Sequence, residues 1–413
     1  MCHLKDSGIE WIGKIPANWQ RVKFNALYIN RNEKVSDKEY RPLSVTKKGI
    51  VPQLETAAKT NDNDNRKLVK VGDFVINSRS DRRGSCGISK LNGSVSLINT
   101  VLAPRNDQMV PRYYDWLFHT VAFSDEFYKW GHGIVDDLWT TNWNDMKNIT
   151  LPLPPKSEQK TIANFLDKKC EKINELSNSI VEEIEQLKNY QNKLITQNIT
   201  KGIEKNVPMK DSGIEWIGTI PESWKLIRIK YLVDIKNNKS KLQEMNGKYI
   251  GLENIQKGNG RYIPSDNVYD DQIYSSCRKG QVLYSKLRPN LAKVLVAPFD
   301  ACCTSEFEVL QAKNIDNRWI KYSLLTDGIT KLASAATYGV KMPRINWDFV
   351  ANMKIPVPNS KDMIDKIIDN LESKLDLINE MINNRNEQIQ LLGELKNSLI
   401  YDYVTGKKTC SKY

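Results

Sequence analysis

The stretch KDSGIEWIGKIPANW, from Lys5 to Trp19, returns as KDSGIEWIGTIPESW from Lys210 to Trp224. The two copies agree at 12 of 15 positions. A second pair of segments follows the same spacing, because NWNDMKNITLPLPP from Asn142 is answered 204 residues later by NWDFVANMKIPVPN from Asn346. The chain is therefore an internal duplication, and the repeat divides it into two halves.

A long amphipathic helix is predicted after each Pro-rich tract, LPLPP and IPVP. Proline cannot continue a helix or a central strand, so each tract is interpreted as an extended exit from a globular domain. Ser157 and Ser360 are the expected caps, and acidic side chains follow in the first turns. Apolar residues then recur at alternating three- and four-residue steps, which is typical of a coiled-coil seam. The predicted seam residues are Ile162, Leu166, Ile173, Leu176, Ile180, Leu187, Tyr190 and Leu194, and then Ile367, Leu371, Ile378, Met381, Leu392, Leu395 and Leu399.

Each seam is long, since about 38 residues at about 1.5 Å each make a rod of roughly 55 Å. Such a rod exceeds one small domain, so we expect the two helices to pair with each other. The alternative is that each covers its own domain as an ordinary amphipathic helix. Arg385 interrupts the second seam where Ile180 stands in the first, and Gly393 lies near it.

The ends of the helices are predicted to meet the repeated motif. Gly202 and Gly406 stand where a helix end favours a left-handed residue. Only a few residues separate the first helix from the second copy of the motif, so that copy must lie beside the helix end. By symmetry, the first copy should lie beside the end of the second helix and bring the chain termini together. We therefore interpret Trp11, Ile12, Ile15 and Trp19 as packed framework.

The bulk composition favours a polyanionic partner. Among 413 residues, 61 Lys and Arg face 49 Asp and Glu, giving a net charge of +12 and a pI near 9.1. We find no run of 18 apolar residues and no secretion signal, so we expect a cytoplasmic protein without a membrane partner. The seven cysteines form no CxxC and only three histidines occur, so we expect no bound metal.

The segments between the frames, about 20–141 and 225–345, share far less sequence than their edges. Different fillings on one frame suggest two recognition surfaces for two short targets; relaxed drift after duplication is the alternative. In each filling an apolar strand runs into a basic loop, VGDFVINSRSDRRG and KGQVLYSKLRPN. Such loops suit groove and phosphate contacts, although a solvated strand end explains any single one. The predicted DNA contacts here are Arg79, Arg82 and Arg83, matched in place by Lys286 and Arg288.

A second candidate region precedes each Asn-Trp pair, in GHGIVDDLWTTNW and TYGVKMPRINW. Its predicted DNA contacts are Thr140, Thr141, Lys341 and Arg344. For Trp143 and Trp347 a core position is the stronger interpretation. The aromatic stretch PRYYDWLFHTVAFSDEFYKW has helical spacing, so we expect a packed helix there rather than a base-stacking platform.

The sequence suggests no chemistry of its own. It contains no phosphate-binding GxxxxGK[ST] loop, no GxGxxG and no amino-methylating Asn-Pro-Pro-aromatic or Asp-Pro-Pro-aromatic tetrapeptide. We therefore expect no catalytic residue and no cofactor in this chain. Two rival interpretations stay open: a self-contained DNA methyltransferase or nuclease with an unrecognised site, and a non-specific coiled-coil scaffold.

The order of these features resembles the specificity subunits of Type I restriction-modification systems. The resemblance spans the whole chain and is carried by the duplicated SGIEWIGxIPxxW, the LPLPP and IPVP exits and the long helices. It implies two target recognition domains that each read half of a bipartite DNA site, separated by antiparallel helices that dock two methylation subunits. The partners in this family bind S-adenosylmethionine, and restriction subunits use ATP, with Mg expected as well.

The predicted fold class is α+β, with two α/β-type globular domains separated by two long antiparallel helices and related by an internal pseudo-two-fold repeat. The predicted boundaries are 1–155 and 204–358 for the recognition domains and 156–203 and 359–413 for the helices. A rod of roughly 55 Å spans between one and two DNA turns of about 34 Å. The helices are therefore expected to act as a ruler between the half-sites.

Overall fold

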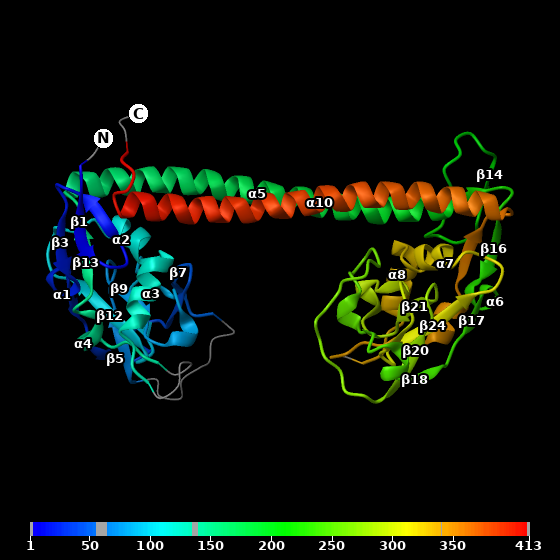
Figure 1. Ribbon diagram of the computed structural model, residues 1–413, viewed down its shortest axis with the longest axis horizontal. Coiled ribbons are helices and arrows are strands. Elements are labelled where there is room, and N and C mark those ends of the chain that lie inside the picture. Colours follow the sequence, from blue (N-terminus) through cyan, green and yellow to red (C-terminus); the bar gives the residue numbers. More distant parts are fainter. Residues whose placement is uncertain (1–2, 55–63, 134–138, 340, 411–413) are drawn as a thin grey trace. The chain divides into compact units, whose positions relative to one another are not determined.

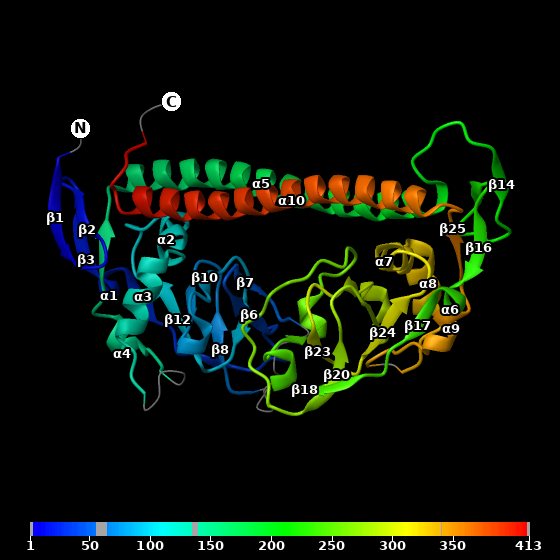
Figure 2. The same ribbon diagram turned by 45° about the vertical axis from the view of Figure 1, so that its right-hand side comes forward.

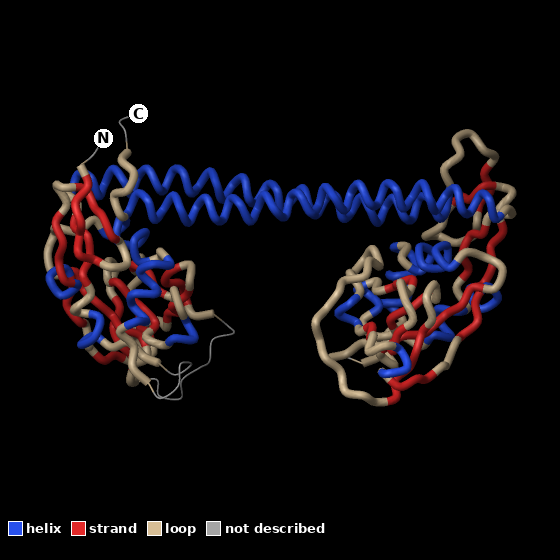
Figure 3. Tube along the Cα trace, viewed as in Figure 1, coloured by secondary structure: helices blue, strands red, loops and turns tan. Residues whose placement is uncertain are grey.

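The structure is a computed structural model, and it describes residues 3–54, 64–133, 139–339 and 341–410. The chain divides into two compact units, Met1–Ser179 with Gln388–Tyr413, and Ile180–Glu387. Each unit holds one globular part of strands and short helices together with half of each long helix (Figure 3). This is the predicted α+β class.

The globular part of the first unit is built on a four-stranded antiparallel sheet in the order β10-β9-β12-β4. A three-stranded sheet, β11-β8-β5, and three two-stranded ribbons accompany it. The strands are β1 Leu4–Ile9, β2 Gly13–Pro16, β3 Gln20–Lys23, β4 Tyr28–Asn30, β5 Lys34–Val35, β6 Leu43–Thr46, β7 Gly49–Pro52, β8 Arg66–Val69, β9 Phe74–Asn77, β10 Cys86–Ile88, β11 Gly93–Val95, β12 Asn99–Pro104 and β13 Thr150–Leu153. The helices are α1 Phe24–Leu27, η1 Ser80–Arg82, α2 Pro111–Phe118, α3 Val121–Lys129 and α4 Trp143–Met146.

The globular part of the second unit repeats this frame. Its sheet β22-β21-β24-β17 has the strand order of β10-β9-β12-β4, and a second sheet has the order β18-β20-β23-β19. The strands are β14 Met209–Asp211, β15 Thr219–Pro221, β16 Lys225–Arg228, β17 Val233–Ile235, β18 Lys239–Lys241, β19 Tyr249–Ile250, β20 Ile273–Cys277, β21 Val282–Ser285, β22 Val294–Val296, β23 Ala301–Cys303, β24 Phe307–Ala312 and β25 Lys354–Val357. The helices are α6 Ile229–Leu232, η3 Gln243–Met245, η4 Leu252–Asn254, η5 Pro289–Leu291, α7 Asn317–Leu324, α8 Asp327–Ala335 and α9 Trp347–Ala351.

The two frames differ mainly between their matching strands β5–β8 and β18–β20. In the first unit this interval contains the antiparallel hairpin β6–β7. In the second it contains η3, η4 and strand β19, which pairs in parallel with β23. The structure thus places much of the divergence between the halves in one insertion on a common frame.

Most of each Pro-rich tract forms a paired strand rather than free extended chain. β13 pairs with β3 and β25 pairs with β16, each as an antiparallel two-stranded ribbon. A two-stranded ribbon leaves one edge of each strand without a ladder partner, so proline is tolerated there. The long helices follow directly, as α5 Lys156–Lys201 and α10 Lys361–Val404.

The two long helices run antiparallel in both units, and their halves lie side by side in two views (Figure 1, Figure 2). In the first unit Phe165 stacks against Tyr403, with ring centroids 4.4 Å apart. In the second unit Gln191 Nε2 donates to Asn379 Oδ1 at 2.8 Å. Arg385, the break in the predicted seam, forms an ion pair with Glu183 at 2.9 Å, so a charge is accommodated there.

The predicted heptad seam is only partly right. Leu176, Tyr190, Met381 and Leu395 are half-exposed, whereas Ile184 and other residues outside the seam are buried. The first turns of α5 pack into the core of their own globular part, through Ile162, Ala163, Leu166 and Cys170. A helix that contacts both a partner helix and a globular part has a wider apolar stripe than an a/d seam. Both predicted alternatives therefore hold, because the first turns of α5 contact the globular core and α10 together.

The repeated motif closes each unit, as predicted from its position. In the first unit Tyr401 Oη donates to the Trp11 carbonyl at 3.2 Å, and Tyr113 Oη donates to the Val404 carbonyl at 2.6 Å. Gly406 adopts φ 73° and packs against Pro16 and Trp19. In the second unit Gly202, with φ 72°, packs in the same way against Trp224. The ends of the described chain therefore meet within one core.

Candidate nucleic-acid interface

Two segments that are far apart in the sequence form one surface in the first globular part. The loop after β9 is joined to residues 139–141 by backbone bonds, from Ser80 N to the Trp139 carbonyl at 2.9 Å and from Thr141 N to the Ser78 carbonyl at 3.0 Å. Arg79 also forms a bridge with Thr140. Both predicted contact regions of this half therefore lie side by side.

The second globular part repeats the arrangement bond for bond. Arg288 N donates to the Pro343 carbonyl at 2.7 Å, and Ile345 N donates to the Lys286 carbonyl at 3.0 Å. Leu287 forms a bridge with Arg344. We call these two surfaces the first and second reading loops: residues 78–83 with 139–141, and residues 286–288 with 341–345.

The matched bonds show which positions correspond. Ser80 corresponds to Arg288, because the backbone N–H of each donates to the carbonyl two residues before the equivalent framework residue, that of Trp139 in the first half and that of Pro343 in the second. By the same criterion Thr140 corresponds to Arg344, since both form the equivalent bridges. The segments match as predicted, but the charges do not coincide residue by residue. The common backbone therefore presents different side chains at equivalent points.

Carboxylates hold the arginines of the first reading loop. Asp81 forms ion pairs with Arg79 at 3.0 Å and with Arg82 at 3.6 Å. Arg83 forms an ion pair with Asp125 at 2.6 Å, and its guanidinium lies 5.4 Å from the centroid of the Tyr128 ring. All three arginines keep substantial exposure, and Arg82 is the most exposed.

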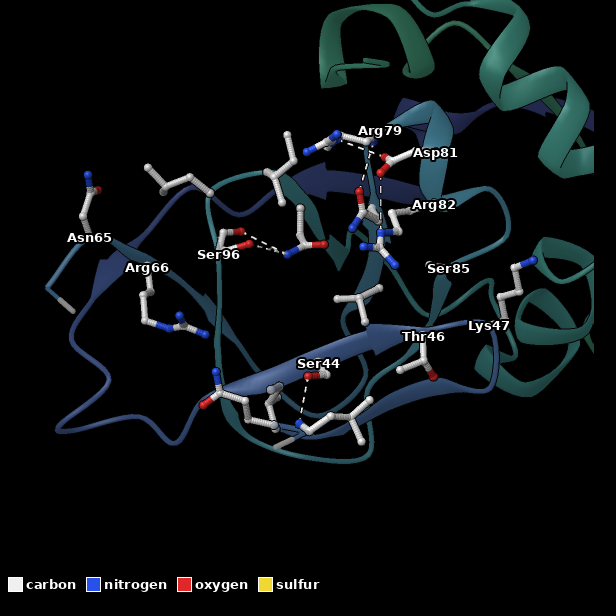
Figure 4. Close-up of a pocket in the computed structure, with 18 residues that line it drawn as sticks. Ser44, Thr46, Lys47, Asn65, Arg66, Arg79, Asp81, Arg82, Ser85 and Ser96 are labelled. Atoms are coloured by element: carbon white, nitrogen blue, oxygen red, sulfur yellow. Dashed lines mark hydrogen bonds and ion pairs between the residues drawn. The ribbon is translucent and has the colours of Figure 1, made fainter. Parts of the chain in front are cut away.

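A groove of about 1010 Å³ opens beside this loop (Figure 4). Arg79, Asp81 and Arg82 stand together on one side, while Ser44 and Thr46 of β6 stand on another. Among the residues that the structure describes, four basic side chains and one carboxylate line the groove, together with neutral polar and apolar residues; the basic ones are Lys47, Arg66, Arg79 and Arg82. The excess of basic over acidic side chains suits contact with the phosphates and groove edges of a nucleic acid.

The second reading loop has a different polar set. Arg344 forms a two-point fork with Glu306, whose Nε–Oε2 distance is 3.1 Å. The hydrogen bond from Arg344 lowers the pKa of the Glu306 carboxyl. Lys286 pairs with Glu308 at 3.2 Å and lines a small cavity of about 230 Å³ together with Lys236 and Lys239.

Arg288 and Lys341 are the exposed cations of this surface. In the part of the chain that the structure describes, neither side chain has an ion-pair partner. Arg288 sits at φ 50°, a left-handed conformation that is uncommon for a residue with a side chain. A strained backbone at an exposed, unpaired arginine is consistent with a residue placed for contact.

One predicted contact needs correction. Thr141 is fully buried, and its hydroxyl donates to the Phe127 carbonyl at 3.0 Å. Because a buried, satisfied hydroxyl offers nothing to a ligand, Thr141 is part of the framework. Thr140 stays partly exposed.

Sequence reasoning missed several residues of these surfaces. Two large side chains are exposed here, Tyr338 beside the second reading loop and Met342 within it. Ser44, Thr46 and Lys47 come from the β6–β7 insertion, far from the basic loop in sequence, and only the fold brings them to the groove. Lys236 and Lys239 flank a pair of asparagines after β17, and this short polar run is the one local signal that could have indicated them.

The aromatic stretch is packed framework, as predicted, although it forms two helices instead of one. Tyr113 of α2 and Phe123 and Phe127 of α3 are fully buried. The first helix ends at Phe118, and Thr120 caps the start of the second, accepting from Phe123 N at 3.2 Å. Trp347 is buried in the second half, and Trp143 packs partly buried against the first core.

Within the described ranges, no cluster of three metal-binding side chains occurs. No helix found there is long and apolar enough to cross a membrane.

One known family model matches both halves of the duplication. The profile of the Type I restriction modification DNA specificity domain matches twice, at residues 18–186 and 221–391. The chain belongs to the Type I restriction-modification specificity subunit family. It is thus a DNA specificity subunit, a class of subunit that is not catalytic. One match falls within each repeat, so each half of the duplication contains one family domain.

Relatives with curated names agree with this assignment. The chain is 28% identical over 235 residues to the EcoDI specificity subunit of Escherichia coli, a match that covers 52% of each chain. It is 25% identical over 328 residues to the MjaVIII specificity subunit of Methanocaldococcus jannaschii, covering 74% of each. The chain thus spans about half the length of the first relative and about three quarters of the second.

Solved structures share the fold. One chain from a study of complex assembly and conformational transition of the type I R-M system superposes with a TM-score of 0.70 at 14% identity, covering 95% of this chain and 99% of that one. The HsdS subunit from Thermoanaerobacter tengcongensis superposes with a TM-score of 0.50 at 16% identity, covering 95% and 98%.

Proposed function

We propose that this specificity subunit reads a bipartite, asymmetric site in double-stranded DNA, one half with each reading loop. The observation that carries the proposal is the pair of reading loops on matched frames. The backbone bonds that join the segments are the same in both halves, whereas the side chains differ at corresponding points. A common frame with unlike surfaces suits two different half-sites.

The DNA contacts we propose are the exposed and partly exposed polar side chains of the reading loops. Arginine can fork onto guanine O6 and N7, and lysine and arginine hold phosphates. In the first half these residues are Arg79, Arg82, Arg83 and Thr140, and in the second half they are Lys286, Arg288, Lys341 and Arg344. Contacts to phosphate should make binding weaken steeply with salt, while base contacts keep the sequence preference.

We also propose that the long helices dock two methylation subunits and, through them, restriction subunits. Half-exposed apolar side chains on the helices support this, because monomers rarely leave large apolar side chains clustered in water. In the first unit, Leu176 and Leu395 line an open cavity of about 530 Å³ between α5 and α10. In the second unit, Tyr190, Leu377 and Met381 are exposed on the same helices.

The partners, in this proposal, supply the chemistry in the cytoplasm: S-adenosylmethionine for adenine methylation, and ATP with Mg for restriction. This chain supplies the sequence preference. The functional boundaries we propose are recognition domains at 1–155 and 204–358 and helices at 156–203 and 359–413.

The experiment is to map methylated adenines in DNA from cells with and without this chain, in the presence of its methylation subunits. We expect one bipartite motif to be methylated only when the chain is present. Methylation of that bipartite motif in cells without the chain would contradict the proposal. Methylation or cleavage of DNA by the purified chain alone would instead favour a self-contained enzyme.

A further inference from the structure

A carboxylate from outside the second reading loop, Glu306, faces Arg344 of that loop. Glu306 accepts two hydrogen bonds from Arg344, at 3.1 Å from Nε and a shorter one from Nη2. The Arg344 side chain is 43% exposed and that of Glu306 is 23% exposed. The fork therefore fixes the plane of a guanidinium that still reaches the surface.

In the first reading loop a different carboxylate, Asp81, pairs with two of the arginines. Asp81 lies inside the basic loop and pairs with Arg79 and Arg82. Glu306 instead precedes β24 and corresponds to Ile98, because Lys286 N donates to the Glu306 carbonyl and Ser78 N donates to that of Ile98. The two carboxylates therefore stand at positions that do not correspond in the duplicated frame. Its presence in both halves points to a role in reading rather than in the common frame.

Ion pairs that reach solvent usually contribute little to folding, so stability is a weak reason for these pairs. Two effects on DNA binding give a stronger reason. An arginine already held in one orientation loses less conformational freedom when it forks onto a base. A carboxylate beside it also repels phosphates, so purely electrostatic, sequence-independent binding is weakened.

We propose that Glu306, and Asp81 in the other half, are positioning residues that set sequence preference by orienting the reading arginines and opposing contact with phosphate alone. The inference rests on the proposed DNA-reading function. Glu306 acts through Arg344 rather than by touching a base. The other role open to a carboxylate, accepting from cytosine N4, makes a different prediction.

The test measures binding of the full chain, in complex with its methylation subunits, to three DNA duplexes over a range of salt concentrations. One duplex carries the mapped site, one has the half-site of the second reading loop altered, and one is unrelated. For Glu306→Gln we expect the ratio of site to unrelated affinity to fall about ten-fold, within the range that one arginine–base fork is worth. Unrelated DNA should bind more tightly, and the preference at the other half-site should not change.

Asp300→Asn is the matched control. Asp300 pairs with Arg278 at 2.8 Å near the other end of β21, so this variant changes the charge equally in the same globular part. It should leave the affinity ratio unchanged. Arg344→Lys keeps the charge but cannot form the fork, so it should lose preference at the same half-site even if Glu306→Gln does not fold.

A double-variant cycle separates the two roles of the carboxylate. The cycle compares the mapped site with the duplex whose half-site is altered, because phosphate repulsion affects these two duplexes equally. If Glu306 orients Arg344, adding Glu306→Gln to Arg344→Ala produces no further loss of preference between them. A further loss would show direct base contact and overturn the proposal. An unchanged ratio in Glu306→Gln, or the same change in Asp300→Asn, would also overturn it. Absence of any preference in the unaltered complex would instead refute the proposed function on which the inference rests.

Discussion

Closure of the first unit by the repeated motif can be tested at Gly406. This glycine has φ 73°, and a Cβ added to it would clash with Pro16 Cδ and lie 2.9 Å from Trp19. A left-handed alanine costs about 1–2 kcal/mol, and overpacking adds about 1–3 kcal/mol. Gly406→Ala should therefore lower the free energy of unfolding of the first unit by about 2–5 kcal/mol.

Gly202→Ala provides the matched comparison. It has nearly the same φ, 72°, but its nearest neighbour, Trp224 Cζ2, lies 3.1 Å from the added Cβ and is a single aromatic edge. Its cost should be mostly the conformational one, about 1–2 kcal/mol. The difference between the variants measures the tighter contact with the N-terminal motif.

Hydrogen exchange read by mass spectrometry assigns each loss to a segment. Gly406→Ala should speed exchange in β1, β2 and the last turns of α10, while β14 and β15 keep their protection. Gly202→Ala should show the opposite pattern. If Gly406→Ala costs no more than Gly202→Ala, or leaves β1 and β2 protected, the motif does not close the unit as described.

Three further predictions concern the helices and their contacts. Inserting four residues, about 6 Å, into both long helices at matched positions should lengthen the preferred gap between half-sites by roughly two base pairs, and an unchanged gap in the methylation map would reject the ruler. Lys321→Met should stabilise the chain at pH 7, because burial lowers the pKa of Lys321 to about 8 from an ordinary 10.5. Between about pH 8 and 10.5 the unfolded state of the unaltered chain binds more protons than the folded state, so the stability of that chain should rise with pH in this window. The variant should not show this rise. Urea midpoints of the two chains that stay parallel from about pH 7 to 10 would contradict the prediction. Gln159→Ala should cost about 3 kcal/mol in urea unfolding, because the buried Gln159 amide accepts from Val110 N at 2.7 Å and donates to two carbonyls, and a loss below about 1 kcal/mol would show that water replaces these bonds.

The sequence was most informative where the duplication repeated a local rule. Gly202 and Gly406 were predicted as left-handed helix ends, and both are. The motif was predicted to meet the helix ends, and Trp19 and Trp224 do so. The glycine prediction succeeded because a left-handed backbone conformation favours glycine, so one residue reports the conformation at its own position. The repeat then showed the same pattern twice.

The helix seam was predicted less well, because its burial depends on two partners at once. A heptad pattern assumes one facing helix, whereas α5 also packs into a globular core at its start. Leu176 stands in the predicted seam and lines the open cavity between α5 and α10, yet it is half-exposed. Periodicity alone cannot report which of several surfaces covers a residue.

The sequence indicated the two segments of each proposed reading loop, but not which side chains they bring together. Strand-to-loop patterns identified both basic segments, and tertiary pairing then joined each to a second segment through backbone bonds. Thr141 was predicted as a contact and is buried, whereas Ser44 and Thr46 reach the groove from an insertion. Side-chain neighbours across such distances depend on strand pairing, which local sequence does not specify.

The central claim is that two unlike reading loops each read one half of a site. Its most direct test is to map adenine methylation in cells that carry the methylation subunits with Arg82→Ala or Arg288→Ala in this chain. We predict that each variant relaxes the preference at one half-site only, and that the two variants affect opposite halves. Equal relaxation of both halves by either variant, or of the same half by both, would contradict the claim.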